Sequence, residues 1–175
     1  NKLDRVVSLG ESPLANNLMH SIEEESEMYP LEMDYCSNCH NCQLSVVVPP
    51  EKMFDNYLYV SSTSSKFVKH FEETSEKYIN DFNLNEESFV VDIGSNDGIA
   101  LKPLQKHGVK VLGVEPAENV AKIANDQGIP THNSYFNYEA AMSILENHGR
   151  ADLITASNVF AHSDKLKEMA ECMLA

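Results

Sequence analysis

Residues 88–175 alternate between short apolar stretches and segments of helical periodicity, and this alternation limits the possible folds more than any other feature. The strand-like stretches are 88–94, 110–116, 129–136 and 151–158. The helical segments are 98–107, 117–127, 138–147 and the residues from 163 onward. Strands that alternate with helices of about ten residues form right-handed βαβ units. The sequence therefore predicts an α/β fold built on a parallel sheet.

The loop after the first of these strands is a candidate ligand site. Ligands of open parallel sheets bind beyond the carboxyl ends of the strands. There the chain reads Asp-Ile-Gly-Ser-Asn-Asp-Gly over residues 92–98, and Glu115 ends the second strand. Glu115 follows Gly94 by 21 residues, which is about the spacing at which a carboxylate reaches ribose hydroxyls in dinucleotide-binding folds. A nucleotide is therefore expected at this edge of the sheet.

The charge of this loop favours a cationic nucleotide over a pyrophosphate. Asn96 and Ile99 stand where the dinucleotide fingerprint has its second and third glycines, and the sequence has no Gly-Lys-Ser/Thr phosphate loop. Asp92 and Asp97 would repel a pyrophosphate, whereas S-adenosylmethionine carries an ammonium and a sulfonium group. S-adenosylmethionine is therefore the predicted cofactor. NAD, and a sheet that binds no ligand, are the alternatives.

The cysteines indicate a metal site. Cys36, Cys39 and Cys42 are separated by two-residue gaps, which let thiolates converge on one ion. Three sulfurs do not complete a tetrahedral zinc site, so the pattern favours half of a structural site whose other ligands lie outside the chain. Idle thiols are one alternative, and an iron–sulfur cluster, which would need a cysteine where Val46 stands, is another. Because no long-range disulfide framework is available, a reducing, cytoplasmic location is expected.

Residues 1–62 show poor helical periodicity and are predicted to form a small strand-and-loop module. Apolar stretches at 5–9 and 44–48 are separated by turn residues, and the acidic stretch 23–27 is interpreted as solvated. A helix is expected next, because large aromatic residues recur at roughly helical spacing from residue 67. Between them, residues 57–65 carry two tyrosines and five hydroxyl residues, which indicate either a helix N-cap or a substrate-facing arm.

The charge balance excludes some partners. The chain has 27 acidic and 13 basic side chains and a formal net charge of -14. A nucleic acid polymer or an anionic membrane surface would be repelled, but a nucleotide-sized ligand needs only a local pocket. No apolar run approaches the roughly 20 residues that a membrane span requires. The expected partner is a small-molecule substrate.

The motifs resemble those of a known family. Residues 92–98, followed by Gly-Val-Glu-Pro at 113–116, resemble the first two motifs of class I S-adenosylmethionine-dependent methyltransferases. A wider set, in the family's order and covering nearly the whole chain, resembles nucleotide-sugar (NDP-hexose) C-methyltransferases. These segments are residues 9–16, the Cys36 and Cys39 pair with Gln-Leu at 43–44, Tyr-x-Tyr-x-Ser-Ser at 57–62, residues 91–98, and Asn-Val-Phe-Ala-His at 158–162.

The resemblance implies a three-part enzyme with a Rossmann-like core. Residues 1–62 would be part of a zinc-binding module, 63–87 a linking helix and 88–175 an incomplete methyltransferase core. The family's zinc site uses two Cys-x-x-Cys pairs, so Cys36 and Cys39 would be the second pair, with the first upstream of this chain. The chain is thus expected to be a fragment truncated at both ends. It would contain neither the full zinc site nor the general base, and it would be inactive alone.

The resemblance also implies the chemistry and its residues. A 4-keto nucleotide-sugar would lose a proton beside its carbonyl, and the enolate carbon would attack the sulfonium methyl. Tyr57, Tyr59 and His162 match positions near the sugar and the methyl donor and are the catalytic candidates; a helix-capping role is the alternative for His162. The cofactor-binding candidates are Asp92, Gly94, Asn96, Gly98, Glu115, Pro116, Tyr135, Phe136 and Asn158.

Three other functions stay open at this point. The chain can belong to a methyltransferase of another small molecule, to an NAD-dependent oxidoreductase, or to a non-catalytic protein that interacts through its zinc module.

Overall fold

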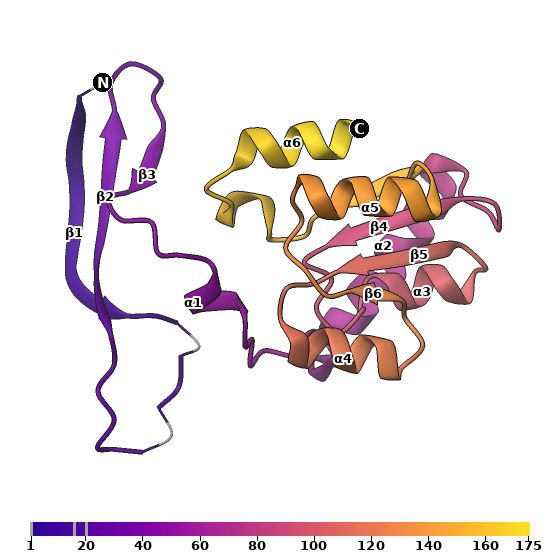
Figure 1. The fold of residues 1–175 in the computed structure, drawn as a ribbon, viewed down its shortest axis with the longest axis horizontal. Coiled ribbons are helices and arrows are strands. Elements are labelled where there is room, and N and C mark those ends of the chain that lie inside the picture. Colours follow the sequence, from indigo (N-terminus) through magenta and orange to yellow (C-terminus); the bar gives the residue numbers. More distant parts are fainter. Residues whose placement is uncertain (1, 16, 20) are drawn as a thin grey trace. The chain divides into compact units, whose positions relative to one another are not determined.

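A computed structural model describes residues 2–15, 17–19 and 21–175. Asn16, the last residue of the motif at 9–16, therefore lies outside the described residues. The chain divides into two compact units, the first ending at Phe54 and the second covering Asp55–Ala175. Figure 1 labels the elements of both units, which are described separately below.

The first unit is a three-stranded antiparallel sheet in the order β1-β2-β3. Its strands are β1 (Leu3–Pro13), β2 (Met28–Cys36) and β3 (Cys42–Leu44), and a short helix, α1 (Glu51–Phe54), follows. The predicted strand-and-loop module is confirmed, although β2 was not anticipated and β3 covers only the start of the predicted apolar stretch 44–48. Among the described residues of this unit, Cys36 alone is buried. The unit therefore has very little apolar core of its own.

The second unit contains the predicted parallel sheet. Its strands, in the spatial order β6-β5-β4-β7, are β4 (Phe89–Ile93), β5 (Lys110–Val114), β6 (Thr131–His132) and β7 (Leu153–Thr155). All three pairings are parallel, and the register places Asp92 beside both Gly113 and Thr155. The α/β fold expected from the sequence is thus confirmed.

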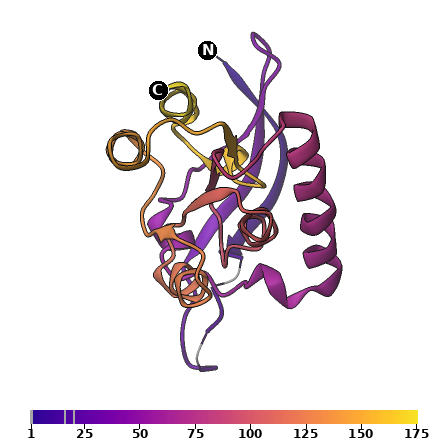
Figure 2. The same cartoon turned by 90° about the vertical axis from the view of Figure 1, so that its right-hand side faces the viewer.

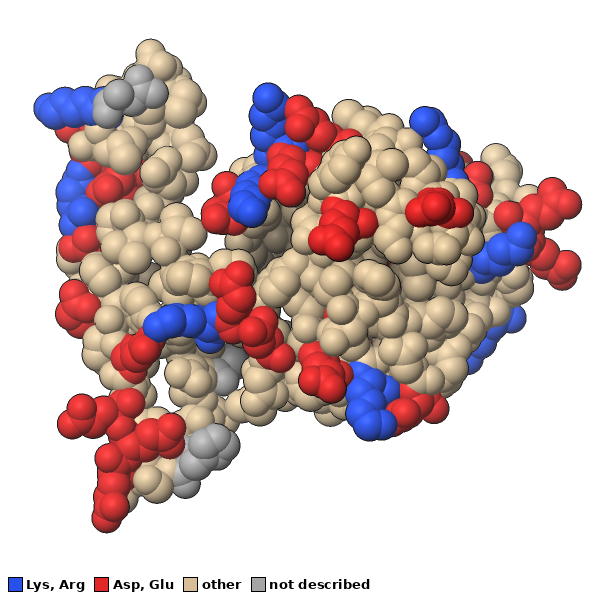
Figure 3. Space-filling view, in the orientation of Figure 1, with Lys and Arg blue, Asp and Glu red and all other residues tan. Residues whose placement is uncertain are grey.

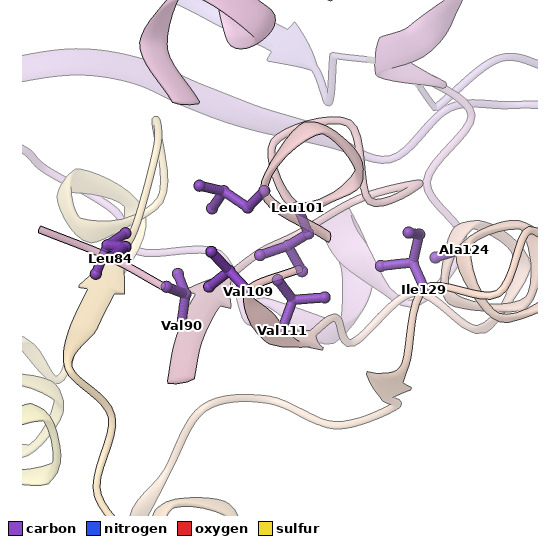
Figure 4. Packing of buried hydrophobic residues seen from close by; sticks show 8 residues of the cluster. Leu84, Val90, Leu101, Val109, Val111, Ala124 and Ile129 are labelled. Carbon is purple, nitrogen blue, oxygen red and sulfur yellow. The ribbon is translucent and has the colours of Figure 1, made fainter. Parts of the chain in front are cut away.

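Helices cover both faces of this sheet (Figures 1 and 2). They are α2 (Ser65–Phe82), α3 (Leu101–Lys106), α4 (Glu118–Asp126), α5 (Tyr138–His148) and α6 (Leu166–Leu174). Because side chains alternate along a strand, Val90 and Val111 pack with Leu101 on one face (Figure 4), whereas Val91 and Leu112 pack with the α5 side. The two buried clusters fix the strands, and hence the loops at their carboxyl ends.

Several boundaries differ from the sequence prediction for backbone reasons. Helix α3 begins at Leu101 instead of Gly98, because Gly98 has a φ of 79°, which no right-handed helix contains. The expected strand at 151–158 ends at Thr155, and Asn158 further along has a left-handed φ of 57°. Ser64 caps α2 by accepting the backbone N–H of Phe67 at 3.4 Å, so the N-cap interpretation of the hydroxyl run is confirmed for this residue.

Acidic side chains are spread over the face shown in Figure 3, and several adjoin one another over the loop between β1 and β2. Several acidic side chains pair with lysines one helical turn away, as in Lys69–Glu73 and Lys122–Asp126. The stretch 23–27 is exposed except at Ser26 and forms neither helix nor strand, as expected of a solvated loop. None of the helices that the structure describes combines the length and apolar character needed to cross a membrane.

Candidate functional site

The loop that follows β4 turns back sharply at the carboxyl edge of the sheet. Gly94, Asn96 and Gly98 all have positive φ angles, of 66°, 52° and 79°. Glycine adopts this region without steric cost, and asparagine tolerates it better than most residues. The turn is anchored to β5, because the Gly94 N–H donates to the carbonyl of Val114 at 2.7 Å. The spacing of the motif is therefore a backbone requirement as well as a candidate ligand signature.

Glu115 connects this loop to the end of β5. Its carboxylate accepts the backbone N–H of Asn96 at 2.8 Å and that of Ala117 at 2.9 Å. The side chain is buried, and burial raises the pKa of Glu115, while the two N–H donors act in the opposite direction. A carboxylate has about four lone-pair directions, so two of these remain for other donors. The structure thus joins the loop and this acid directly at the carboxyl edge of the sheet.

Asp92 is a second buried carboxyl group at this edge. Its Oδ1 accepts the hydroxyl of Thr155 on β7 at 2.6 Å, and the residue is 3% exposed. Burial raises the pKa of Asp92 to about 7, the Thr155 hydrogen bond opposes this, and the charge of Glu115 adds to it. Buried acids with strongly shifted pKa values and a charged neighbour are typical of functional sites.

Two polar atoms of the loop are left without a hydrogen-bond partner within the part of the chain that the structure describes. They are the Ser95 hydroxyl oxygen and Oδ1 of Asp97. Ser95 is 1% exposed and Asp97 is 2% exposed, and the other carboxylate oxygen of Asp97 accepts the N–H of Ser62 at 3.1 Å. Buried polar atoms without partners are costly, so this loop has hydrogen-bonding groups that the described residues do not satisfy.

The segment before α2 runs along this loop. The side chain of Asn96 accepts the N–H of Ser61 at 3.0 Å and donates to the carbonyl of Tyr59 at 2.9 Å. Asn119, at the start of α4, makes the same pair of bonds with Tyr57, accepting its N–H at 3.2 Å and donating to its carbonyl at 2.8 Å. The structure thus brings two predicted catalytic residues next to the predicted cofactor loop. Asn119 was missed, because spacing alone does not separate it from other exposed helix residues.

The remaining predicted residues lie around this edge in different settings. The carbonyl of Pro116 accepts the side chain of Asn133 at 2.8 Å, and the Tyr135 hydroxyl donates to Asp55 at 2.8 Å. Phe136 is half-buried against the cluster on the α5 side of the sheet. Asn158 and His162 are exposed, and His162 ends a short 3₁₀ turn, η2 (Phe160–His162).

Val159, which sequence reasoning also missed, packs on Gly94. A Cβ atom added at Gly94 would overlap Cγ2 of Val159. Gly94→Ala is expected to destabilise the fold by about 2–4 kcal/mol, from a positive φ that costs alanine about 1–2 kcal/mol and from the overlap. When Val159→Ala is combined with Gly94→Ala, the stability lost to the overlap should be regained. The loss caused by the positive φ should remain. Urea unfolding of the two single variants and the double variant measures this; additive losses would contradict the contact.

The predicted metal ligands Cys36 and Cys39 lie in a tight turn. The N–H of His40 donates to the carbonyl of Cys36 at 2.8 Å, closing a tight turn. The backbone N–H of Cys39, followed by that of Asn38 and the Cys39 thiol, lowers the pKa of the buried Cys36 thiol. Within the described residues, no group of three or more histidine, cysteine or acidic side chains is placed to hold a metal. The described residues therefore do not form a complete metal site.

Comparisons with known proteins agree with this geometry. Residues 1–54 match the family model described as "Putative zinc binding domain", and residues 67–175 match the model described as "Methyltransferase domain". The C-methyltransferase NovU of Streptomyces niveus is 32% identical over 166 residues, which are 94% of this chain and 40% of that protein. The chain thus spans well under half the length of this curated relative.

A solved structure is similar at lower identity. Magnesium protoporphyrin IX methyltransferase (ChlM) from Synechocystis PCC 6803, determined with bound SAM, is 16% identical with a TM-score of 0.47, and the match covers 61% of this chain and 52% of that one. Because the methyltransferase-domain model covers more than half of the chain, the predicted membership is confirmed, and the chain belongs to the class I S-adenosylmethionine-dependent methyltransferase-domain family.

Proposed function

We propose that this chain is the donor-binding part of an S-adenosylmethionine-dependent C-methyltransferase. The observation that carries the proposal is the Glu115 carboxylate, buried at the carboxyl edge of the sheet and hydrogen-bonded to the N–H of Asn96 in the glycine loop. The relative NovU, whose name states C-methyltransferase, matches almost the whole chain. Together these support methyl transfer to carbon over other chemistries of the same fold.

The residues at this edge suit the donor. When bound, S-adenosylmethionine supplies an electrophilic methyl group next to a positive sulfur. Glu115 would accept the ribose hydroxyls with its remaining lone pairs, and Gly94 and Gly98 would let the backbone approach the ligand. Asp92 and Asp97 are acidic, and Asp97 keeps one carboxylate oxygen without a partner among the described residues, which fits a cationic ligand. Pro116, Tyr135, Phe136 and Asn158 are proposed to border the donor, the aromatic pair near its adenine.

The proposed acceptor is a keto nucleotide-sugar that reacts through its enolate. Tyr57 and Tyr59 lie on the segment held by the cofactor loop, with ring centroids 6.5 Å apart, and His162 is exposed at the end of η2. Hydroxyl and imidazole groups can transfer protons and donate hydrogen bonds to an enolate oxygen. We assign these three residues to proton handling or enolate stabilisation. The transfer itself needs no metal ligand from this site.

We also propose that Cys36 and Cys39 hold half of a structural zinc site. The tight turn at Cys36 and its lowered pKa favour a thiolate, the form that binds zinc. A metal would supply stability to a sheet that buries so little apolar surface. The proposed division into residues 1–62, 63–87 and 88–175, and a cytoplasmic location with reduced thiols, belong to the same proposal.

Calorimetry with the full-length protein tests the donor site. S-adenosylhomocysteine, the product form of the donor, should bind at one site with a micromolar Kd, and NADH should not bind. Incubation with radiolabelled S-adenosylmethionine and a dTDP-activated 4-keto hexose should then transfer label to carbon. NADH binding without S-adenosylhomocysteine binding would indicate an oxidoreductase, and binding of neither would indicate a non-catalytic protein. Donor binding without sugar labelling would leave a methyltransferase of another small molecule.

A further inference from the structure

The segment from Asp55 to Thr63, here called the tyrosine arm, forms neither helix nor strand over its tyrosines and is extended at Val60, where φ is -102° and ψ is 113°. In an extended chain, the N–H and C=O groups of alternate residues point to the same side, and the side chains of alternate residues share a face. The arm follows this rule, because the groups bound by the two asparagines belong to Tyr57, Tyr59 and Ser61. The rings of Tyr57 and Tyr59 are correspondingly side by side, in an edge-to-face arrangement with an interplanar angle of 73°.

The two asparagines substitute for a neighbouring strand. Each side-chain amide donates one hydrogen bond and accepts another from the backbone edge of the arm, at distances between 2.8 and 3.2 Å. Asn96 comes from the glycine loop and Asn119 from the first turn of α4. Further tethers are the bond from Ser62 to Asp97 and that from Tyr135 to Asp55. The arm is therefore held at several points by residues of the edge that carries Glu115.

We propose that Asn119 and Asn96 are positioning residues, which hold the tyrosine arm by paired amide hydrogen bonds and so direct Tyr57 and Tyr59 to the acceptor substrate. This inference rests on the proposed function, since it assigns the tyrosines to the acceptor. It differs from a role in binding the methyl donor, because the oxygen and the nitrogen of both amide side chains each make a hydrogen bond with the arm. An amide side chain supplies, on neighbouring atoms, both the donor and the acceptor that this bridging requires.

The arm itself gives the first readout. In Asn119→Ala, the amide hydrogen of Tyr57 loses its acceptor and should exchange at least about tenfold faster, which corresponds to about one net hydrogen bond. Asn119→Asp keeps that acceptor and loses only the donor to the Tyr57 carbonyl, so exchange at Tyr57 should rise less. Asn96→Gly removes the second amide and suits the positive φ at this position, and should free the amide of Ser61. Asn147→Ala removes an amide bonded to Ser143 within α5 and is the matched control.

Hydrogen exchange and kinetics of the full-length protein are measured on the same samples. With a dTDP-activated 4-keto hexose, Asn119→Ala should lower kcat/KM for the sugar by about tenfold or more, as expected for two lost hydrogen bonds. The Kd for S-adenosylhomocysteine should stay within about twofold, because Asn119 is not among the residues proposed to contact the methyl donor. A general loss of structure would weaken both sugar turnover and S-adenosylhomocysteine binding, whereas a loss of positioning lowers sugar turnover alone.

The outcomes are distinct. Faster exchange confined to the arm, with a selective loss of sugar turnover, supports the positioning role. Faster exchange with unchanged sugar kinetics overturns it, and so does unchanged exchange at Tyr57 and Ser61. If the unmodified protein binds no S-adenosylhomocysteine, the proposed function fails, and the assignment of the tyrosines to its acceptor falls with it; exchange on the same samples then shows whether the asparagines hold the arm at all.

Discussion

Glu115→Gln is expected to weaken S-adenosylhomocysteine binding by more than about 100-fold. Each hydrogen bond to a charged group contributes about 1.5–3 kcal/mol, and a Kd changes tenfold for about 1.4 kcal/mol. In the proposed site, Glu115 accepts two such bonds from the ribose hydroxyls. Glu115 also accepts hydrogen bonds from the backbone N–H groups of Asn96 and Ala117. In glutamine, the NH₂ group would face one of these N–H donors, and that hydrogen bond would be lost. Calorimetry on the full-length protein measures the loss.

The neighbouring acid provides the matched control. Glu118 lies in the exposed first turn of α4, so Glu118→Gln changes the net charge by the same amount and should leave the Kd within about twofold. Circular dichroism and the unfolding temperature of Glu115→Gln establish that the variant is folded. A folded Glu115→Gln protein that still binds the ligand as tightly as the unmodified protein would refute the assignment of this carboxylate to the donor.

Asp92→Asn is expected to stabilise the ligand-free protein at alkaline pH and to make little difference near pH 4. The pKa of Asp92 is about 7 in the folded state, against an ordinary value of 3.8. Between these values the folded state holds a proton that the unfolded state has lost, so stability falls as the pH rises through this window. The difference corresponds to about 4 kcal/mol in total, or about 1.4 kcal/mol per pH unit. Asparagine does not ionise, so the variant should lack this contribution.

Urea unfolding of ligand-free Asp92→Asn and the unmodified protein, from about pH 5 to about pH 8, checks this linkage. The difference in the free energy of unfolding should grow with pH and level off above about pH 7 to 8. Thr155→Val removes the hydrogen bond that favours the ionised form, so its stability should fall over a window that extends to higher pH. A difference between Asp92→Asn and the unmodified protein that does not depend on pH would show that Asp92 is ionised throughout.

The sequence was sufficient to predict the position of Glu115 but not the hydrogen-bond partner of Asp92. The position of Glu115 after the second strand was enough to place it at the same edge of the sheet as the glycine loop, because parallel register brings the ends of neighbouring strands together. The partner of Asp92 was not predictable, since Thr155 lies 63 residues away on β7 and its position depends on the strand order. The hydrogen bonds between Asn119 and Tyr57, which lies 62 residues earlier, could not be predicted for the same reason.

By itself, the sequence determined the alternation of strands and helices, the parallel sheet and the glycine loop that ends at Gly98. These follow from local periodicity and from backbone angles that few residues adopt. Only the tertiary structure decided which side chains become partners of the loop, and that the tyrosine arm lies along it. Those features depend on contacts between residues distant in sequence, whose energies no local pattern encodes.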